Sequence, residues 1–218
     1  TTLTVAIPNG TSTAPINVVS TAGFPSSGYI IIDQEIISYT TTTATQFDGT
    51  ITRGVLGTTA GKGAHAVGAY ATEAQATTAG TSAAMEVRTV TASNAITCTV
   101  PSSRIYVANK GIYNIQFSVQ LLNYATTDDN VTIWVRKNGT DVTASAGIQQ
   151  INPKHGTSPG AIIAGWNYID SYNAGDYVEL VWASETGNTV LATYPPGTAP
   201  THPSSPSLIL TVTFVSSV

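Results

Sequence analysis

The stretch Gly111–Asn123, with the sequence GIYNIQFSVQLLN, is the strongest local signal in the chain. Apolar residues occupy every second position from Tyr113 to Leu121, and the residues between them are Asn, Gln and Ser. Successive side chains of a β-strand point to opposite faces of a sheet. The alternation therefore predicts one long strand with a buried face and a polar face.

The composition predicts a protein with an unusually uncharged surface. Of the 218 residues, 42% are hydrophobic and only 9% are charged, against roughly 25% charged residues in an ordinary globular protein. Such a surface suits a protein that buries much of itself against other subunits. Eight Lys and Arg and a net charge of -4 cannot track a phosphate backbone, so no nucleic-acid partner is expected. No apolar run approaches the roughly 20 residues that span a bilayer, so no membrane partner is expected either.

Cys98 is the only cysteine, so no disulfide can form within the chain. It alternates with Ile96 and Val100, which predicts a buried thiol in a strand. A fold without disulfides is compatible with assembly in a reducing host cytoplasm. The first ten residues, TTLTVAIPNG, lack the basic and apolar regions of a signal peptide.

Turn signals divide the chain into short strands. Residues 1–73 are predicted to form a small β module. Residues 74–85, AQATTAGTSAAM, have no charge and no alternation, and they are predicted to be a linker at the domain boundary. Residues 86–218 are predicted to form a second β domain of about ten strands, which is typical of a sandwich or jelly roll. The predicted strands lie at residues 3–7, 16–20, 29–32, 35–39, 45–47, 50–53, 67–72, 86–91, 95–100, 104–108, 112–123, 131–137, 147–151, 161–168, 177–183, 189–194 and 207–215.

No motif predicts an enzyme. The segment 156–160, GTSPG, has the letters of a nucleophile elbow with His155 beside it. That chemistry needs a strand, a sharp turn presenting Ser158, and then a helix. Pro159 and the strand-like sequence that follows it favour a surface loop instead.

Metal and cofactor motifs are also missing. The histidines His65, His155 and His202 have no zinc spacing, and no phosphate-binding glycine loop occurs. Asp128 and Asp129 in the loop TTDDN could bind a hard cation such as Ca²⁺, although an ordinary polar turn is the default interpretation. We therefore expect no cofactor.

The chain has three Trp and ten Tyr, which raises the alternative of glycan binding, because sugars stack on exposed aromatic rings. Trp134 falls on the face opposite Val131 and Val135, so we expect it to be exposed or at an interface. Trp166 and Trp182 lie in apolar strands and are expected in the core.

The N-terminal module resembles a segment that recurs in virion proteins of tailed bacteriophages. The resemblance lies in residues 23–40, GFPSSGYIIIDQEIISYT, and residues 51–69, ITRGVLGTTAGKGAHAVGA. It implies a module that docks on the virion shell through the major capsid protein. The docking candidates within it are Phe24, Asp33, Glu35, Arg53 and His65.

The C-terminal domain resembles the C1q/tumour-necrosis-factor jelly-roll superfamily. Residues 111–117, GIYNIQF, are similar to its Gly-x-Tyr-x-Phe strand, and residues 175–180, GDYVEL, to its Gly-Asp-x-Val-x-Leu strand. That superfamily forms trimers with aromatic side chains of inner strands along the three-fold axis. The resemblance therefore implies a homotrimer, with an interface formed by Tyr113, Ile115, Phe117, Val119 and Phe214.

Two loops are rich in residues that stiffen the backbone. They are residues 152–160, NPKHGTSPG, and 195–206, PPGTAPTHPSSP. Function is disproportionately carried by such loops, so Lys154, His155 and His202 are candidates for external contacts.

Together these features predict a non-enzymatic capsid decoration (cement) protein of a tailed phage, located on the virion surface as a trimer. The alternative is a head-fibre or tail-fibre protein that binds a host-surface glycan or receptor.

Overall fold

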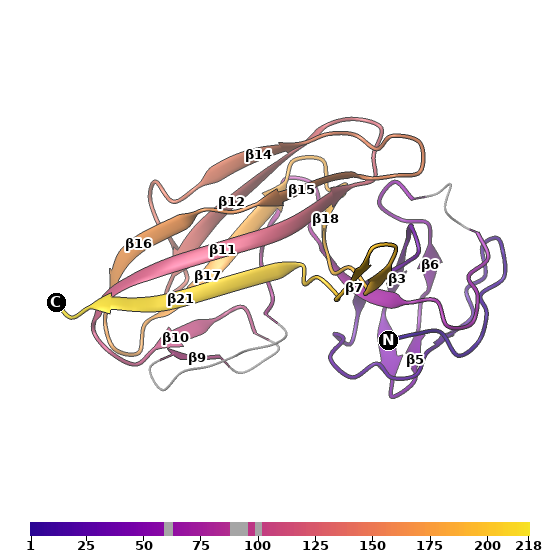
Figure 1. Ribbon diagram of the computed structural model, residues 1–218, viewed down its shortest axis with the longest axis horizontal. Coiled ribbons are helices and arrows are strands. Elements are labelled where there is room, and N and C mark those ends of the chain that lie inside the picture. Colours follow the sequence, from indigo (N-terminus) through magenta and orange to yellow (C-terminus); the bar gives the residue numbers. More distant parts are fainter. Residues whose placement is uncertain (59–62, 88–95, 99–101) are drawn as a thin grey trace.

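The structure is a computed structural model that describes residues 1–58, 63–87, 96–98 and 102–218. Every regular element in these ranges is a β-strand, so the prediction of an all-β fold is confirmed. Figure 1 shows the N-terminal part at one end of a longer C-terminal sandwich. No helix long and apolar enough to cross a membrane occurs in the described ranges.

The N-terminal part is built around a hairpin of β2 (Gly28–Ile32) and β3 (Glu35–Tyr39), which turns at Asp33 and Gln34. Both faces of this hairpin are buried. Ile30 and Ile32 pack into the N-terminal core, whereas Ile31 and Ile36 pack against the C-terminal part. Burial on both faces explains why the strands read as continuous apolar runs rather than as an alternation. The surrounding strands are β1 (Ile16–Asn17), β4 (Thr41–Thr43), β5 (Gln46–Asp48) and β6 (Thr52–Arg53).

Strand β7 (Ala71–Ala76) joins the two parts of the chain in one sheet. It pairs with β2 and with β18 (Thr189–Ala192). Strand β8 (Ser82–Ala84) then pairs with β17 (Tyr177–Ser184) in the opposite sheet. Residues 74–76 and 82–84 of the predicted linker therefore belong to strands, and residues 77–81 connect them. Main-chain hydrogen bonds to neighbouring strands order these residues. Such bonds do not require an alternation of apolar and polar side chains, so the sequence gave no strand signal here.

The C-terminal part is a sandwich of two antiparallel layers. One layer contains β11 (Gly111–Asn123), which pairs with β15 (Gly160–Ala164), β16 (Asn167–Tyr172), β18 and β21 (Leu208–Ser216). The other layer contains β8, β9 (Ile96–Thr97), β10 (Ile105–Val107), β12 (Asp129–Lys137), β13 (Thr140–Asp141), β14 (Gly147–Ile151) and β17. A small hairpin of β19 (Gly197–Thr198) and β20 (Thr201–His202) lies in the proline-rich loop.

The apolar face of β11 fills the core of the sandwich. The side chains of Tyr113, Ile115, Phe117 and Val119 are buried within the single chain, and they belong to one cluster with residues of β12 and β17. The expectation that these four residues line a trimer axis is therefore corrected. The alternation in β11 identified a buried face, and the second layer of the sandwich covers it. Of the five candidates only Phe214 is exposed, at 41%.

Two predicted strands lie partly outside the described residues. Residues 88–91 of the strand 86–91, and residues 95 and 99–100 of the strand 95–100, are in this group. The described residues between them include β9, and Cys98 follows it, half-buried against the sandwich core. Burial raises the pKa of the Cys98 thiol.

Candidate functional site

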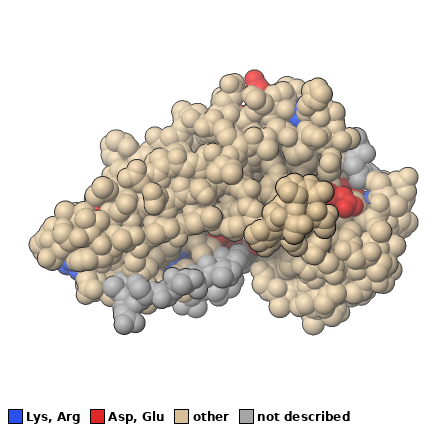
Figure 2. Space-filling model, in the orientation of Figure 1, with Lys and Arg blue, Asp and Glu red and all other residues tan. Residues whose placement is uncertain are grey.

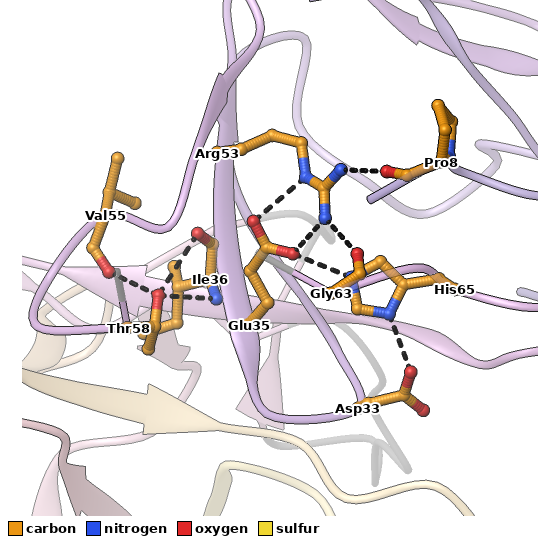
Figure 3. Close-up of polar contacts among 9 residues, drawn as sticks. All are labelled: Pro8, Asp33, Glu35, Ile36, Arg53, Val55, Thr58, Gly63 and His65. Atoms are coloured by element: carbon orange, nitrogen blue, oxygen red, sulfur yellow. Dashed lines mark hydrogen bonds and ion pairs between the residues drawn. The ribbon is translucent and has the colours of Figure 1, made fainter. Parts of the chain in front are cut away.

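Four of the five docking candidates form one network of charged side chains, Asp33, Glu35, Arg53 and His65, which we call the Glu35 cluster (Figure 3). The turn of the β2–β3 hairpin carries the two carboxylates, and β6 carries Arg53. The sequence separations are 18 residues for Glu35–Arg53 and 30 residues for Glu35–His65. The network thus ties together segments that are distant in sequence.

The guanidinium of Arg53 makes four hydrogen bonds. Its Nε donates to Glu35 Oε1 at 3.0 Å, and one terminal nitrogen donates to Glu35 Oε2 at 2.5 Å. The same nitrogen donates to the carbonyl of Gly63 at 2.6 Å, and the other donates to the carbonyl of Pro8 at 2.7 Å. A bidentate guanidinium–carboxylate pair has fixed geometry, so Arg53 locks the N-terminal segment and the loop before His65 onto the hairpin.

The carboxylate that binds Arg53 also contacts His65. The Nε2 atom of His65 lies 2.7 Å from Glu35 Oε2, and Nδ1 lies 2.6 Å from Asp33 Oδ2. A carboxylate only accepts hydrogen bonds, so both ring nitrogens must carry protons. His65 is therefore an imidazolium, and the cluster holds two negative and two positive charges.

The pKa values of the cluster agree with this charge state. The hydrogen bond to Glu35 is the main cause that raises the pKa of His65; desolvation by burial opposes it, and the hydrogen bond to Asp33 supports it. For Glu35, burial alone would raise the pKa, but the hydrogen bonds from His65 and Arg53 outweigh it and lower the pKa. The ionised forms of both residues are thus stabilised in the fold.

The burial of the cluster determines what it can do. Glu35, Arg53 and His65 are almost fully buried, and every polar atom of their side chains described above is engaged. They cannot form a docking surface, so their assignment as docking residues is corrected. A buried network that links loops has a structural role. Glu35, Arg53 and His65 offer neither an unengaged base nor an open ligand position.

Asp33 and Phe24, the two docking candidates that are not fully buried, differ in exposure. The side chain of Asp33 is 61% exposed, so it remains available at the surface. Phe24 packs edge-on against Phe47, with ring centroids 5.0 Å apart, and covers the N-terminal core. The structure therefore places Phe24 mainly in packing, and leaves Asp33 as the one exposed charge of the predicted set.

The three loop candidates, Lys154, His155 and His202, differ in whether they are available to an outside partner. Lys154 Nζ donates to the carbonyl of Gly57 at 2.9 Å, so this side chain connects the sandwich to the N-terminal part rather than pointing to an outside partner. His155 and His202 are exposed. His155 and Ser158 exchange backbone hydrogen bonds across a tight turn, and this turn leads into β15. No helix follows it, so the nucleophile-elbow geometry is missing here.

The carboxylate of Asp129 is buried and holds the turn between β17 and β18. Ser184 and Thr189 each donate a hydroxyl to Oδ2 at 2.6 Å, and the Thr186 amide donates to Oδ1 at 3.0 Å. These donors outweigh burial, which would raise the pKa of Asp129, and they lower it. Hydroxyl and amide donors thus occupy the oxygens that a cation would need. The described residues contain no group of three or more His, Cys, Asp or Glu that could hold a metal ion.

The polar side of β11 forms an uncharged face on the sandwich. The sequence predicted this polar side but gave no function for it. Strand registers place neutral residues side by side on this face. Ile169 on β16 and Ile209 on β21 are exposed at 57% and 54%. Figure 2 shows few Lys, Arg, Asp or Glu over this part of the molecule. The uncharged face consists of Asn167, Ile169, Ser171, Ile112, Asn114, Gln116, Ser118, Gln120, Ile209, Thr211 and Thr213.

Comparison of the sequence with protein-family models gave no match, and comparison with curated proteins gave none.

Proposed function

We propose that this protein is a non-enzymatic virion protein of a tailed phage, a capsid decoration protein that assembles as a homotrimer on the capsid surface. The observation that carries the proposal is the uncharged face on β16, β11 and β21. The virion assignment is supported by the two sequence resemblances, to phage virion segments and to the C1q/tumour-necrosis-factor jelly roll.

The uncharged face suits a second copy of the same chain as its partner. Interface cores are depleted in charged residues, and a neutral face presents no charge that would repel an identical neutral face. Exposed Ile169 and Ile209 supply apolar area, which stabilises association by about 25 cal/mol per Å² buried. This face replaces the buried side of β11 as the candidate trimer interface.

The N-terminal part is the proposed contact with the major capsid protein. It lies at the end of the molecule opposite the C-terminus (Figure 1), so a trimer of sandwiches could present three copies of it. Within it, the Glu35 cluster fixes the loops rather than touching the partner.

Substitution of Ile209 tests the proposed interface. We expect the wild-type protein to sediment as a trimer and Ile209→Lys to sediment as a monomer, because a lysine on the face would have to be desolvated on association. The matched control is Ile148→Lys, on β14 in the other layer, where Ile148 is 73% exposed; this variant should remain trimeric. A monomeric wild type, or a trimeric Ile209→Lys variant, contradicts the proposal.

Antibody labelling of purified virions tests the location. Label on the heads, with many copies per particle by quantitative mass spectrometry, is expected. Label confined to the tail, with few copies, contradicts the decoration role.

A further inference from the structure

A cleft lined by three tyrosines lies at the junction of the N-terminal part and the sandwich. Its volume is about 200 Å³, and Tyr70, Tyr124 and Tyr194 are among its lining residues. Strands β2, β7, β11 and β18 belong to one sheet that spans both parts of the chain. The residues that line the cleft lie in these strands or just beyond their ends. Ligand sites occur preferentially at such junctions between domains.

The tyrosines differ in how deeply they lie. Tyr124 is buried, Tyr194 is half-buried, and Tyr70 is 43% exposed. Tyr70 therefore presents exposed area at the cleft. Apolar side chains of Leu122 and Ile31 also line the cleft. An aromatic ring presents an apolar face together with a polar hydroxyl.

Asp33 supplies a charged acceptor at this cleft. It is among the lining residues, and its Oδ2 accepts from His65 Nδ1 at 2.6 Å. Within the described part of the chain no hydrogen bond is made by Oδ1. The bond to His65 holds the carboxylate in place, so Oδ1 is a fixed acceptor on a side chain that is 61% exposed.

We propose that the cleft binds one residue of a neutral saccharide, which stacks on a tyrosine ring and donates a hydroxyl to Asp33. A sugar combines an apolar C–H face with hydroxyl groups, and the cleft offers aromatic faces with fixed polar groups. Its volume lies below the roughly 300 Å³ of common ligand pockets, which suits a single sugar unit. This site goes beyond the proposed decoration role and does not depend on it.

The charges around the cleft argue for a neutral ligand. No Lys or Arg is among the lining residues, so the site has no partner for the carboxylate of an acidic sugar. The imidazolium of His65 compensates the charge of Asp33. The net attraction for a cation is therefore weak, and a polyhydroxyl ligand fits better than a quaternary ammonium ion.

Ligand-observed NMR on the full chain tests the proposal. The probes are the methyl glycosides of glucose, galactose, mannose, N-acetylglucosamine and rhamnose, together with glucuronic acid and choline as charged comparisons. We expect at least one neutral glycoside to bind, and Tyr70→Ala to weaken its binding at least about tenfold, which corresponds to about 1.4 kcal/mol. Asp33→Asn should also weaken binding, although its amide oxygen can still accept from His65.

The matched control is Tyr106→Ala, because Tyr106 on β10 is 39% exposed and lies outside the cleft. This variant should bind like the wild type. The proposal is overturned if none of the five glycosides binds, if Tyr70→Ala binds as tightly as Tyr106→Ala, or if choline or glucuronic acid binds more tightly than every neutral glycoside. The oligomeric state and the virion location would be unaffected by these outcomes, so failure here is distinct from failure of the decoration role.

Discussion

His65 lies between two carboxylates, so its charge determines how much the Glu35 cluster stabilises the fold. The raised pKa of His65 means that its contribution is fully present below the unfolded value near 6.5 and is lost as the pH rises through the folded value. The lowered pKa of Glu35 means that its contribution is present above the unfolded value near 4.3 and is lost as the pH falls through the folded value. The cluster is therefore most stabilising between about pH 4.3 and pH 6.5.

Replacement of His65 by Gln should remove the loss of stability that the His65 contribution shows as the pH rises. At pH 6 we expect the free energy of unfolding to fall by about 1–3 kcal/mol, because the buried carboxylate of Glu35 and the exposed carboxylate of Asp33 lose a charged donor. Between pH 6 and pH 9 the difference between wild type and His65→Gln should shrink. Urea unfolding across this range measures it, and other titrating groups cancel in the difference.

The exposed His202 provides the control for this experiment. Its ring contacts only the carbonyl of the adjacent Pro203 among the hydrogen bonds of the described residues. His202→Gln should leave the free energy of unfolding unchanged at every pH. A constant difference between wild type and His65→Gln from pH 6 to pH 9 would show that the charge of His65 does not contribute.

The sequence could nominate the members of the cluster but not their pairing. Asp33, Glu35, Arg53 and His65 were the polar members of the docking candidates in the N-terminal resemblance. Their sequence separations reach 32 residues, and no local pattern reports a contact over that distance. Burial was also hidden, because a charged residue is read as exposed unless its partner is known.

At the scale of elements, β11 shows how far an alternating pattern can be taken. The sequence predicted one strand at 112–123 with one buried face, and the observed strand is Gly111–Asn123, with 13 residues. The alternation could not say whether a second sheet or a second subunit buries that face. The answer lies in β12 and β17, whose apolar residues contact the same core.

Substitution of Phe117 by Asp separates the two interpretations. Phe117 is 5% exposed and packs edge-on against Trp166, with ring centroids 4.6 Å apart. We expect the free energy of unfolding to fall by at least about 3 kcal/mol, because the change leaves a cavity and buries a charge. Near-ultraviolet circular dichroism with urea unfolding measures the loss. The control Phe214→Asp, at a side chain that is 41% exposed, should cost much less. A folded Phe117→Asp monomer of native stability would contradict the core assignment.

At the scale of the whole molecule, two structural parts share one sheet. β7 pairs with β2 of the N-terminal part and with β18 of the sandwich. A separate apolar cluster, with Ile36, Leu122 and Tyr124 among its members, packs between the two parts. The composition of residues 74–85 predicted a boundary, but Ala74 in that segment pairs with strands of both parts.

The shared sheet predicts that the two parts unfold in one transition. Weakening the apolar cluster between them should let the two parts unfold separately. Leu122→Ala should lower the stability by about 2–5 kcal/mol, the usual cost of truncating a buried leucine. Calorimetry should show one transition for the wild type and two for this variant, because a loss at the junction weakens the coupling more than either core. The control Ile148→Ala, at an exposed position of β14, should retain a single transition near the wild-type temperature. Two transitions in the wild type would contradict this prediction. They would mean that the pairing of β7 with β2 and β18 is too weak to make the two parts unfold cooperatively.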